Sequence, residues 1–428
     1  MFISRLFAGL LCAFFAPLLL AQPTTYLTAD AMIDVIGGKT VENPAVVIEN
    51  GRIVAAGEAA DLPVPEGATE VALPGMTILP GLVDMHTHQT SAPDIQGYNR
   101  LKYSVPRRAI KGVANARATL MSGVTTVRDL GAPGFADVAL RDGINSGEVI
   151  GPRMFVSGPS LGITGGHCSA GVLNLLPPGF SGPDESVIDS PWEARKAVRR
   201  NIKYGVDVIK YCATGGVLSK GTKVGVQQPS EEEMRAVVDE AHTRGLIVAS
   251  HAHGTEGIKA AIRAGTDTIE HASFLDDEAI ELAREFGTYL TMDIYLTDYL
   301  LAEGANNGVL PESLEKERMT GQRQRDSFRR AVEADINLLF GTDAGVYPHG
   351  ENPRQLAVMV EYGMSPLQAL RSATVEPAKV LRKTADFGAI EAGRYGDIIA
   401  VAGDPLDDIS IMAEVSFVMR EGVIYKQP

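Results

Sequence analysis

Eight short apolar segments, each followed by a helical stretch, run through the middle of this 428-residue chain. Strands that alternate with helices favour a parallel sheet, and eight such units favour a closed barrel over an open sheet. The sequence therefore predicts an α/β fold in which residues 77–384 form a (β/α)₈ TIM barrel. The predicted strands are 78–85, 124–130, 153–158, 206–211, 246–251, 267–271, 288–294 and 337–342.

Serines mark several of the expected helix starts. Ser190, Ser230 and Ser365 each precede a Glu or Gln by three residues, which is the pattern of a capping box. Pro191 and Pro366 stand at the first helical position, where a missing N–H costs least. The helices of the barrel are thus predicted to begin directly after these serines.

Both chain ends are predicted to be β-structure instead. In residues 22–76, Asn50-Gly51 is a hairpin signal between apolar segments. In residues 385–428, short apolar segments flank the Glu421-Gly422 turn. We expect the two ends to assemble one small β-sandwich domain beside the barrel.

Residues 1–21 have the composition of a secretory signal peptide. Arg5 supplies the positive charge, residues 6–20 are mostly apolar, and Ala21 is a suitable last residue before cleavage. The apolar stretch is short for a bilayer span. We expect an exported protein, periplasmic or secreted, with no stable membrane anchor after signal removal. An uncleaved anchor is the alternative.

The net charge of −14 argues against nucleic acid as a partner, because phosphate binding needs a basic surface. Beyond the signal segment the chain has two cysteines, Cys168 and Cys212. Two cysteines do not make a disulfide framework. We expect both to be small buried packing residues without further chemistry.

Residues able to bind a metal gather at the ends of the predicted strands, where the active sites of such barrels lie. Five of the eight histidines fall there. His86 and His88 are two apart on one strand, so both rings face the same side and can hold one ion together. Imidazole and carboxylate ligands suit zinc. The strand-end residues are His86, His88, Lys210, His251, His253, His271 and Asp343.

Lys210 is the unusual member of this set. It ends an apolar strand, so its side chain points into the barrel, where an unpaired ammonium is costly. A desolvated lysine is more easily neutral. A neutral amine can add carbon dioxide and become an anionic carbamate, which can bridge two cations.

Six of these residues resemble the amidohydrolase superfamily in their order along the chain, namely His86, His88, Lys210, His251, His271 and Asp343. The flanking segments 79–84, 393–397 and 403–406 resemble it as well. Within the superfamily the chain is similar to Xaa-Pro dipeptidases of the imidazolonepropionase-like group and to ochratoxin-hydrolysing amidohydrolases. The motifs that carry this likeness are 164–167, 209–216 and 251–254.

The resemblance implies two divalent metal ions, with zinc as the expected metal. His86, His88 and Asp343 would hold one ion, His251 and His271 the other, with N6-carboxylysine at Lys210 between them. It also implies a homo-oligomer.

Three residues have predicted catalytic roles. Asp343 would move the proton from water to the leaving amine. His167 would polarise the scissile carbonyl; a loop-packing histidine is the alternative. His253 either faces the substrate or holds its own loop.

Several other polar residues near the strand ends have alternative interpretations. His349 either contacts substrate or packs in its loop, and His242 is expected on a solvated helix surface. For Arg128 we favour internal pairing over binding of a substrate carboxylate. Residues 291–293, Thr-Met-Asp, depart from the Thr-Pro-Thr that related proteins usually have, and we expect this to alter the pocket wall.

These residues predict a binuclear hydrolase that cleaves a small-molecule, peptide-like amide next to an amino acid with a free carboxylate. Xaa-Pro dipeptides, N-acyl amino acids and ochratoxin A, which would yield ochratoxin alpha and phenylalanine, all qualify. One alternative is a mononuclear cyclic-amide hydrolase or deaminase. The other is a non-catalytic binding protein on the same fold.

Overall fold

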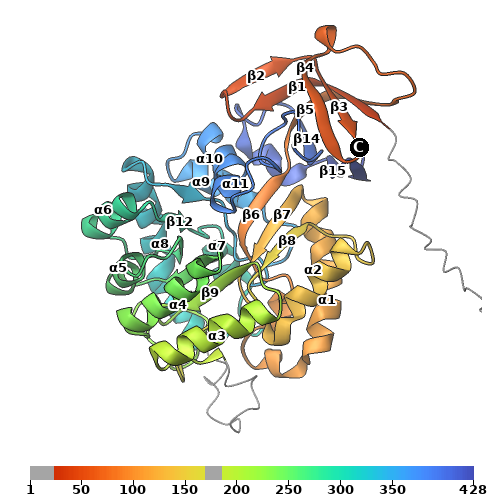
Figure 1. The fold of residues 1–428 in the computed structure, drawn as a ribbon. Coiled ribbons are helices and arrows are strands. Elements are labelled where there is room, and N and C mark those ends of the chain that lie inside the picture. Colours follow the sequence, from red (N-terminus) through yellow and green to blue (C-terminus); the bar gives the residue numbers. More distant parts are fainter. Residues whose placement is uncertain (1–23, 169–185) are drawn as a thin grey trace, which may run out of the picture.

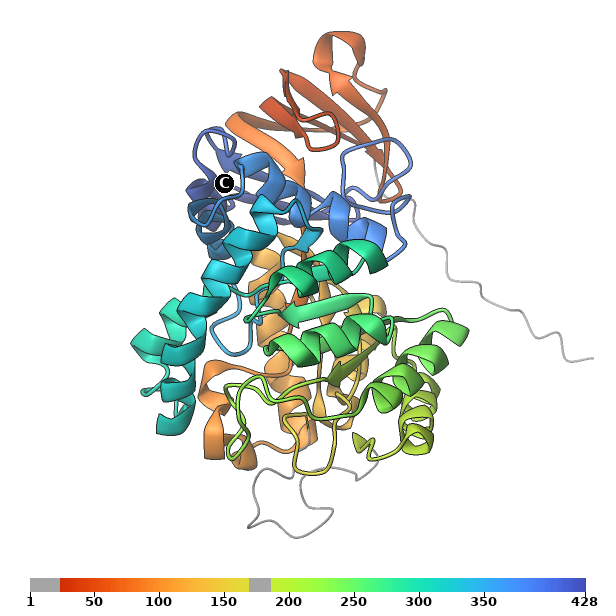
Figure 2. The ribbon, with the colours of Figure 1, turned by 90° about the vertical axis from the view of Figure 1, so that its left-hand side faces the viewer.

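The computed structural model describes residues 24–168 and 186–428. The predicted signal peptide, residues 1–21, lies outside the described residues. Strands from the two chain ends lie together at one end of the molecule, next to the alternating strands and helices of the middle segment (Figure 1 and Figure 2).

The middle segment contains the eight predicted strands, arranged in two parallel sheets. A three-stranded sheet has the order β6-β7-β8, and a five-stranded sheet has the order β13-β12-β11-β10-β9. Isolated parallel bridges join Thr87 to Ala344 and Leu161 to Tyr211 at the two junctions between the sheets. The α/β class is confirmed, but the strand ladder is not continuous around a closed barrel. The strands are β6 (Leu82–Thr87), β7 (Val124–Asp129), β8 (Arg153–Val156), β9 (Val208–Cys212), β10 (Ile247–Ala252), β11 (Thr268–His271), β12 (Tyr289–Thr291) and β13 (Leu338–Leu339).

Helices follow the strands and cover them with apolar faces, as Met234, Val237 and Ala241 of α4 illustrate by their full burial. Ser230 and Ser365 form the predicted capping boxes. The helices are α1 (Val105–Met121), α2 (Ala136–Asn145), α3 (Pro191–Lys203), α4 (Glu231–Thr243), α5 (Thr255–Arg263), α6 (Asp277–Phe286), α7 (Leu296–Glu303), α8 (Pro311–Glu333), α9 (Arg354–Glu361), α10 (Pro366–Ser372) and α11 (Val375–Val380), with 3₁₀ turns η1 (Ala59–Asp61), η2 (Pro93–Ile95), η3 (Gly97–Lys102), η4 (Pro133–Phe135) and η7 (Ile409–Glu414).

Both chain ends contribute to one eight-stranded sheet of order β16-β15-β14-β5-β1-β3-β4, with β2 paired to β1. The joining of the two ends agrees with the expectation, whereas a second layer that would make a sandwich is not confirmed. The predicted domain boundaries stay predictions. The strands are β1 (Thr25–Asp34), β2 (Lys39–Glu42), β3 (Pro44–Glu49), β4 (Arg52–Glu58), β5 (Thr69–Pro80), β14 (Ile398–Ala402), β15 (Phe417–Arg420) and β16 (Val423–Lys426).

The predicted strand 78–85 is divided between two sheets at Gly81. β5 ends at Pro80 and pairs with β14, and β6 begins at Leu82 and pairs with β7. A Cβ at Gly81 would lie 2.2 Å from Thr125 Oγ1, so the junction has no room for a side chain. Both pieces are buried, and a continuous apolar run therefore does not show the break.

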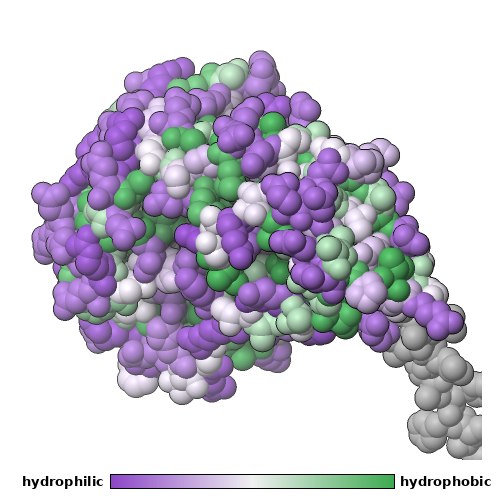
Figure 3. Space-filling view, turned by 90° about the horizontal axis from the view of Figure 1, so that it is seen from above, coloured by the Kyte–Doolittle hydropathy of each residue, from purple (hydrophilic) through white to green (hydrophobic). Residues whose placement is uncertain are grey.

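Polar and apolar residues are interspersed over the face seen from above (Figure 3). Within residues 24–168 and 186–428, no helix combines the length and the apolar character that a membrane span requires.

Candidate active site

The first histidine group consists of His86, His88 and Asp343, at adjacent ends of β6 and β13. Asp343 Oδ1 lies 3.1 Å from His88 Nε2 and 3.6 Å from His86 Nε2. One ligand atom from each of the three residues falls within 4.8 Å of the others. The structure thus brings together the residues predicted to hold the first ion.

The second histidine group consists of His251, His253 and His271, from β10 and β11. Their ligand atoms also lie within 4.8 Å of one another. The His271 ring is 4.5 Å from that of His251 and 5.1 Å from that of His86, so the two groups are adjacent. His253 lies about as close to His271 as the predicted ligand His251 does. The choice of His251 over His253 as a metal ligand stays a prediction.

Two nitrogen atoms at this position are buried without a hydrogen-bond partner in the described part of the chain, Lys210 Nζ and His251 Nε2. Buried polar atoms without partners are rare and costly, and they call for a ligand. Nitrogen and carboxylate oxygen donors around a common space suit a divalent cation such as zinc. The residues present therefore fit the metal ions that the strand-end pattern implies.

The pKa shifts of three groups fit the same role. Burial, followed by the charge of Lys210, lowers the pKa of His86 to about 4. Burial also lowers the pKa of Lys210 to about 8, against the effect of Glu270. Burial alone would raise the pKa of Asp343, but His86 and His88 lower it on balance. Neutral imidazole and ionised carboxylate are the metal-binding forms. Burial alone would also lower the pKa of His88 and His271, but Asp343 and Asp293, respectively, raise it on balance.

Glu270 and Arg128 lie directly behind the first histidine group. His86 Nδ1 is 3.1 Å from Glu270 Oε2, and Arg128 Nη2 donates to Glu270 Oε1 over 2.8 Å. Arg128 Nε also donates to the Met85 carbonyl oxygen over 2.6 Å. The predicted internal pairing of Arg128 is confirmed. Sequence reasoning missed Glu270 as the partner, because the ring that this carboxylate contacts depends on the register between neighbouring strands.

Asp293 holds His271 in a comparable way. His271 Nδ1 lies 2.8 Å from Asp293 Oδ1, which also accepts from Gln324 Nε2 over 2.7 Å. Asp293 is one of the residues that differ from the Thr-Pro-Thr of related proteins, and its carboxylate lies behind His271, a predicted metal ligand. Carboxylates in this position fix the ring orientation of metal-binding histidines.

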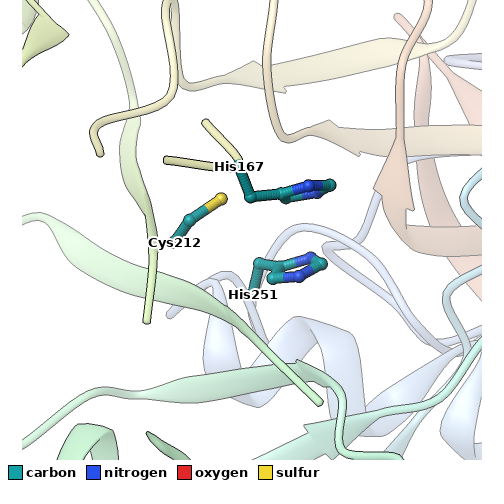
Figure 4. Close-up of side chains that lie close together, drawn as sticks. All are labelled: His167, Cys212 and His251. Carbon is teal, nitrogen blue, oxygen red and sulfur yellow. The ribbon is translucent and has the colours of Figure 1, made fainter. Parts of the chain in front are cut away.

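His167 lies above the second histidine group. Its ring stacks on that of His251 at 4.1 Å with an interplanar angle of 27°, and the Cys212 side chain lies beside both rings (Figure 4). His167 Nδ1 is 2.8 Å from Ser219 Oγ, and its backbone N–H donates to Gln228 Oε1 over 2.9 Å. Burial, then the charge of His271, lowers the pKa of His167 to about 3, so the ring is neutral.

Cys168 and Cys212 form a disulfide with a Cα–Cα distance of 5.7 Å. The prediction that both are inert packing residues is wrong. The two residues are 44 positions apart and meet because the segment after β8 returns to β9, where Leu161 N–H donates to the Lys210 carbonyl oxygen. Such non-local packing leaves no sign in the spacing of two cysteines.

The remaining histidines have internal partners. His349 Nε2 lies 3.1 Å from the Ser91 carbonyl oxygen, and its Nδ1 lies 3.3 Å from Thr119 Oγ1. These contacts agree with packing in its loop. His242, on the partly exposed side of α4, lies 2.8 Å from Asp267 Oδ2.

Residues 77–425 match the model of the amidohydrolase family, so this chain belongs to that family and is a hydrolase that acts on amide bonds. It is 32% identical to ochratoxinase of Aspergillus niger over 91% of this chain and 84% of that protein. A solved Xaa-Pro dipeptidase with bound methionine in its active site is 37% identical, with a TM-score of 0.87 over 94% of this chain and 100% of that one. An imidazolonepropionase of Cutibacterium acnes is 26% identical over 85% of this chain and 84% of that protein.

Proposed function

We propose that this enzyme hydrolyses a peptide-like amide next to an amino acid with a free carboxylate, using two divalent metal ions. The observation that carries the proposal is the convergence of the two histidine groups beside the unpaired amine of Lys210. The likeness to an Xaa-Pro dipeptidase with bound methionine and to ochratoxinase supports the substrate class. Xaa-Pro dipeptides, N-acyl amino acids and ochratoxin A, cleaved to ochratoxin alpha and phenylalanine, are the proposed substrates.

When bound, two zinc ions supply the positive charge that activates water and polarises a carbonyl group. His86, His88 and Asp343 would hold one ion and His251 and His271 the other. Lys210, as N6-carboxylysine, would bridge them; its lowered pKa supports this, because carbon dioxide adds to the neutral amine.

Two neighbouring side chains have proposed roles in the reaction. Asp343 is ionised, so it takes the proton of the attacking water and passes it to the leaving amine. His167 is neutral, and we assign it the tautomer with the proton on Nε2, in which Nδ1 accepts from the Ser219 hydroxyl and Nε2–H donates to the carbonyl oxygen. His253, whose Nδ1 lies 2.7 Å from Ser273 Oγ, is proposed to contact substrate with its other nitrogen.

We also propose that the two parallel sheets form one (β/α)₈ barrel, which the bridges at both junctions support. Export to the periplasm or the medium is proposed on two grounds. The first is the signal-like residues 1–21. The second is the Cys168–Cys212 disulfide, because disulfides persist in oxidising compartments.

A mononuclear cyclic-amide hydrolase is the second candidate, favoured by the imidazolonepropionase relative. Metal analysis of the purified enzyme distinguishes the two, together with a panel of acyl-amino acids with free or blocked carboxylates. We expect two equivalents of metal and turnover of the free-carboxylate substrates alone. One equivalent with cyclic-amide turnover would establish the second candidate, and no turnover on either panel would indicate a binding protein.

Lys210→Ala tests the bridge directly. It should lower turnover by more than about 100-fold, since losing a bridging ligand exceeds the effect of an outer hydrogen-bond partner. Metal content should fall below two equivalents. Lys196→Ala, at an exposed position of α3, is the matched control and should behave as wild type. Full turnover with two bound metals in Lys210→Ala would overturn the proposal.

A further inference from the structure

The segment that carries His167 is joined covalently to the strand that carries Lys210. Cys168 follows His167 directly, and its disulfide partner Cys212 is the last residue of β9, two positions after Lys210. At this place the two parallel sheets meet through the isolated bridge between Leu161 and Tyr211. The disulfide therefore crosses the junction between the sheets beside the site.

The backbone that leads to His167 has polar contacts of its own. Thr164 N–H donates to Asp189 Oδ1 over 2.8 Å, and Gly166 N–H donates to the Ile163 carbonyl oxygen over 2.9 Å. Gly165 and Gly166 precede His167, and Gly165 adopts a φ of +71°, which few other residues tolerate. His167 is mostly buried but keeps some exposure to solvent. On the C-terminal side of His167, the Cys168–Cys212 bond is a covalent restraint, and breaking it removes that restraint on the ring.

The anchors of this segment differ in kind. Ser219 and Gln228 contact His167 by hydrogen bonds, for which water competes once the segment opens. The Cys168–Cys212 bond is not subject to that competition. Cys212 is buried in β9, so the disulfide attaches the residue next to His167 to a strand of the core.

We propose that the Cys168–Cys212 disulfide positions His167 for catalysis by holding its ring in stacking contact with His251. Reduction releases His167 while the histidines on the strand ends keep their places. The effect on turnover rests on the proposed function, in which His167 donates to the carbonyl oxygen. The release of the ring does not depend on that function.

The release is measured by chemical labelling of the folded enzyme. A trialkylphosphine reduces the disulfide, taking up one water to give the phosphine oxide and two thiols, and a gain of two hydrogens in mass verifies the reaction. Diethyl pyrocarbonate then labels accessible histidines, which peptide mass spectrometry identifies. We expect faster labelling of His167 after reduction. His242, partly exposed on α4, is the internal control and should label equally in both states.

Turnover is measured on the same samples. We expect reduction to lower kcat about tenfold, as a small misplacement of a catalytic group does, with metal content unchanged. In a His167→Ala enzyme, reduction should leave kcat within about twofold, because the group that the disulfide positions is gone. The Cys168→Ser/Cys212→Ser variant should match the reduced wild type. Since it has no thiol at these positions, capture of a metal by free sulfur is excluded as the cause.

The outcomes distinguish the positioning role of the disulfide from the catalytic role of His167. Unchanged labelling of His167 after reduction overturns the positioning role. Faster labelling with unchanged kcat, in an enzyme that His167→Ala also leaves unimpaired, overturns the catalytic role of His167 instead. Equal loss of kcat on reduction in wild type and in His167→Ala shows that the disulfide acts through another part of the site, and the proposal falls.

Discussion

His86 and His271 differ from His167 in what lies behind the ring. Each of the two strand-end histidines contacts a buried carboxylate, Glu270 for His86 and Asp293 for His271. His167 contacts a serine hydroxyl, and the disulfide next to it joins its loop to β9. A buried charge is costly to leave without its partner, whereas the loss of a neutral hydrogen bond such as that between His167 and Ser219 costs less. Loss of the Arg128–Glu270 pair behind His86 should therefore lower the stability of the fold, whereas loss of a contact to His167 should leave it nearly unchanged.

Among the variants considered, replacement of Arg128 should have the largest effect, and it should act on the free energy of unfolding. Arg128→Met leaves the Glu270 carboxylate buried without its cation, so we expect the free energy of unfolding to fall by about 3–5 kcal/mol. Urea denaturation of the metal-free enzyme measures this. Arg199→Met, which removes a partly exposed partner of Glu240, is the control and should change the free energy of unfolding little.

A second variant checks the cause. Arg128→Met/Glu270→Leu removes both charges, so it should recover part of the lost stability relative to Arg128→Met alone. If the double variant were as unstable as the sum of the single ones, lost packing rather than the unpaired charge would be responsible.

Asp293→Asn should act on the metal rather than on the fold. The amide keeps the shape but loses the charge that orients His271, and we expect metal affinity to fall about 10–100-fold. Competition with a chelator measures it. Asp298→Asn, on the neighbouring α7 and paired only with Arg325 among the described ion pairs, is the matched control and should bind metal as wild type. Unchanged affinity in Asp293→Asn would mean that Gln324 and packing alone orient the ring.

The strand-end positions of His86, Lys210 and Asp343 could be predicted, because parallel topology places the carboxyl ends of all the strands at one edge. The partners behind them could not. Glu270 and Asp293 were visible as acidic residues at strand ends, but which ring a carboxylate contacts depends on the register between neighbouring strands. Thr268, Ile269 and Glu270 pair with residues of both flanking strands, and the sequence of one strand does not contain that information.

The disulfide was missed for a different reason. Pairing of Cys168 with Cys212 requires the segment after β8 to return to β9, and that path depends on contacts such as the Leu161–Tyr211 bridge. The split of the strand 78–85 at Gly81 has the same origin, since Thr125 on a neighbouring strand excludes a side chain there. Local patterns predicted the elements, and contacts between elements decided the rest.

Ser219→Ala should have a smaller effect, on turnover alone. It removes the hydroxyl that lies 2.8 Å from His167 Nδ1, and a neutral hydrogen bond is worth about 1 kcal/mol, or roughly fivefold in kcat. Steady-state kinetics should show the loss in kcat with metal content unchanged. Ser146→Ala, at an exposed serine whose hydroxyl donates to the Gly143 carbonyl oxygen, is the control. A loss of metal in Ser219→Ala would break the distinction between the two kinds of contact.

The smallest effect concerns a charge cluster away from the site, which gives a baseline for the comparison. Arg153 lies 2.7 Å from Asp397 and 2.5 Å from Glu421, between β8 and the sheet of the chain ends. Burial raises the pKa of Glu421, but Arg153 and Arg420 lower it on balance. A carboxylate with a lowered pKa in the folded state stabilises the fold above its unfolded pKa and loses that contribution as pH falls.

Glu421→Gln should therefore be less stable than wild type at pH 7, by at most about 1 kcal/mol because Glu421 is partly exposed. The difference should shrink as pH falls below about 4.3, the pKa of an unfolded glutamate, since the wild-type carboxyl then becomes neutral as well. Urea denaturation across this range measures the difference, and metal content at pH 7 should be unchanged. A difference that persists at low pH would come from lost packing. A change in metal content would mean that ion pairs far from His86 also affect metal binding. The difference between the contacts of His86 and His271 and those of His167 would then not explain the behaviour of the site.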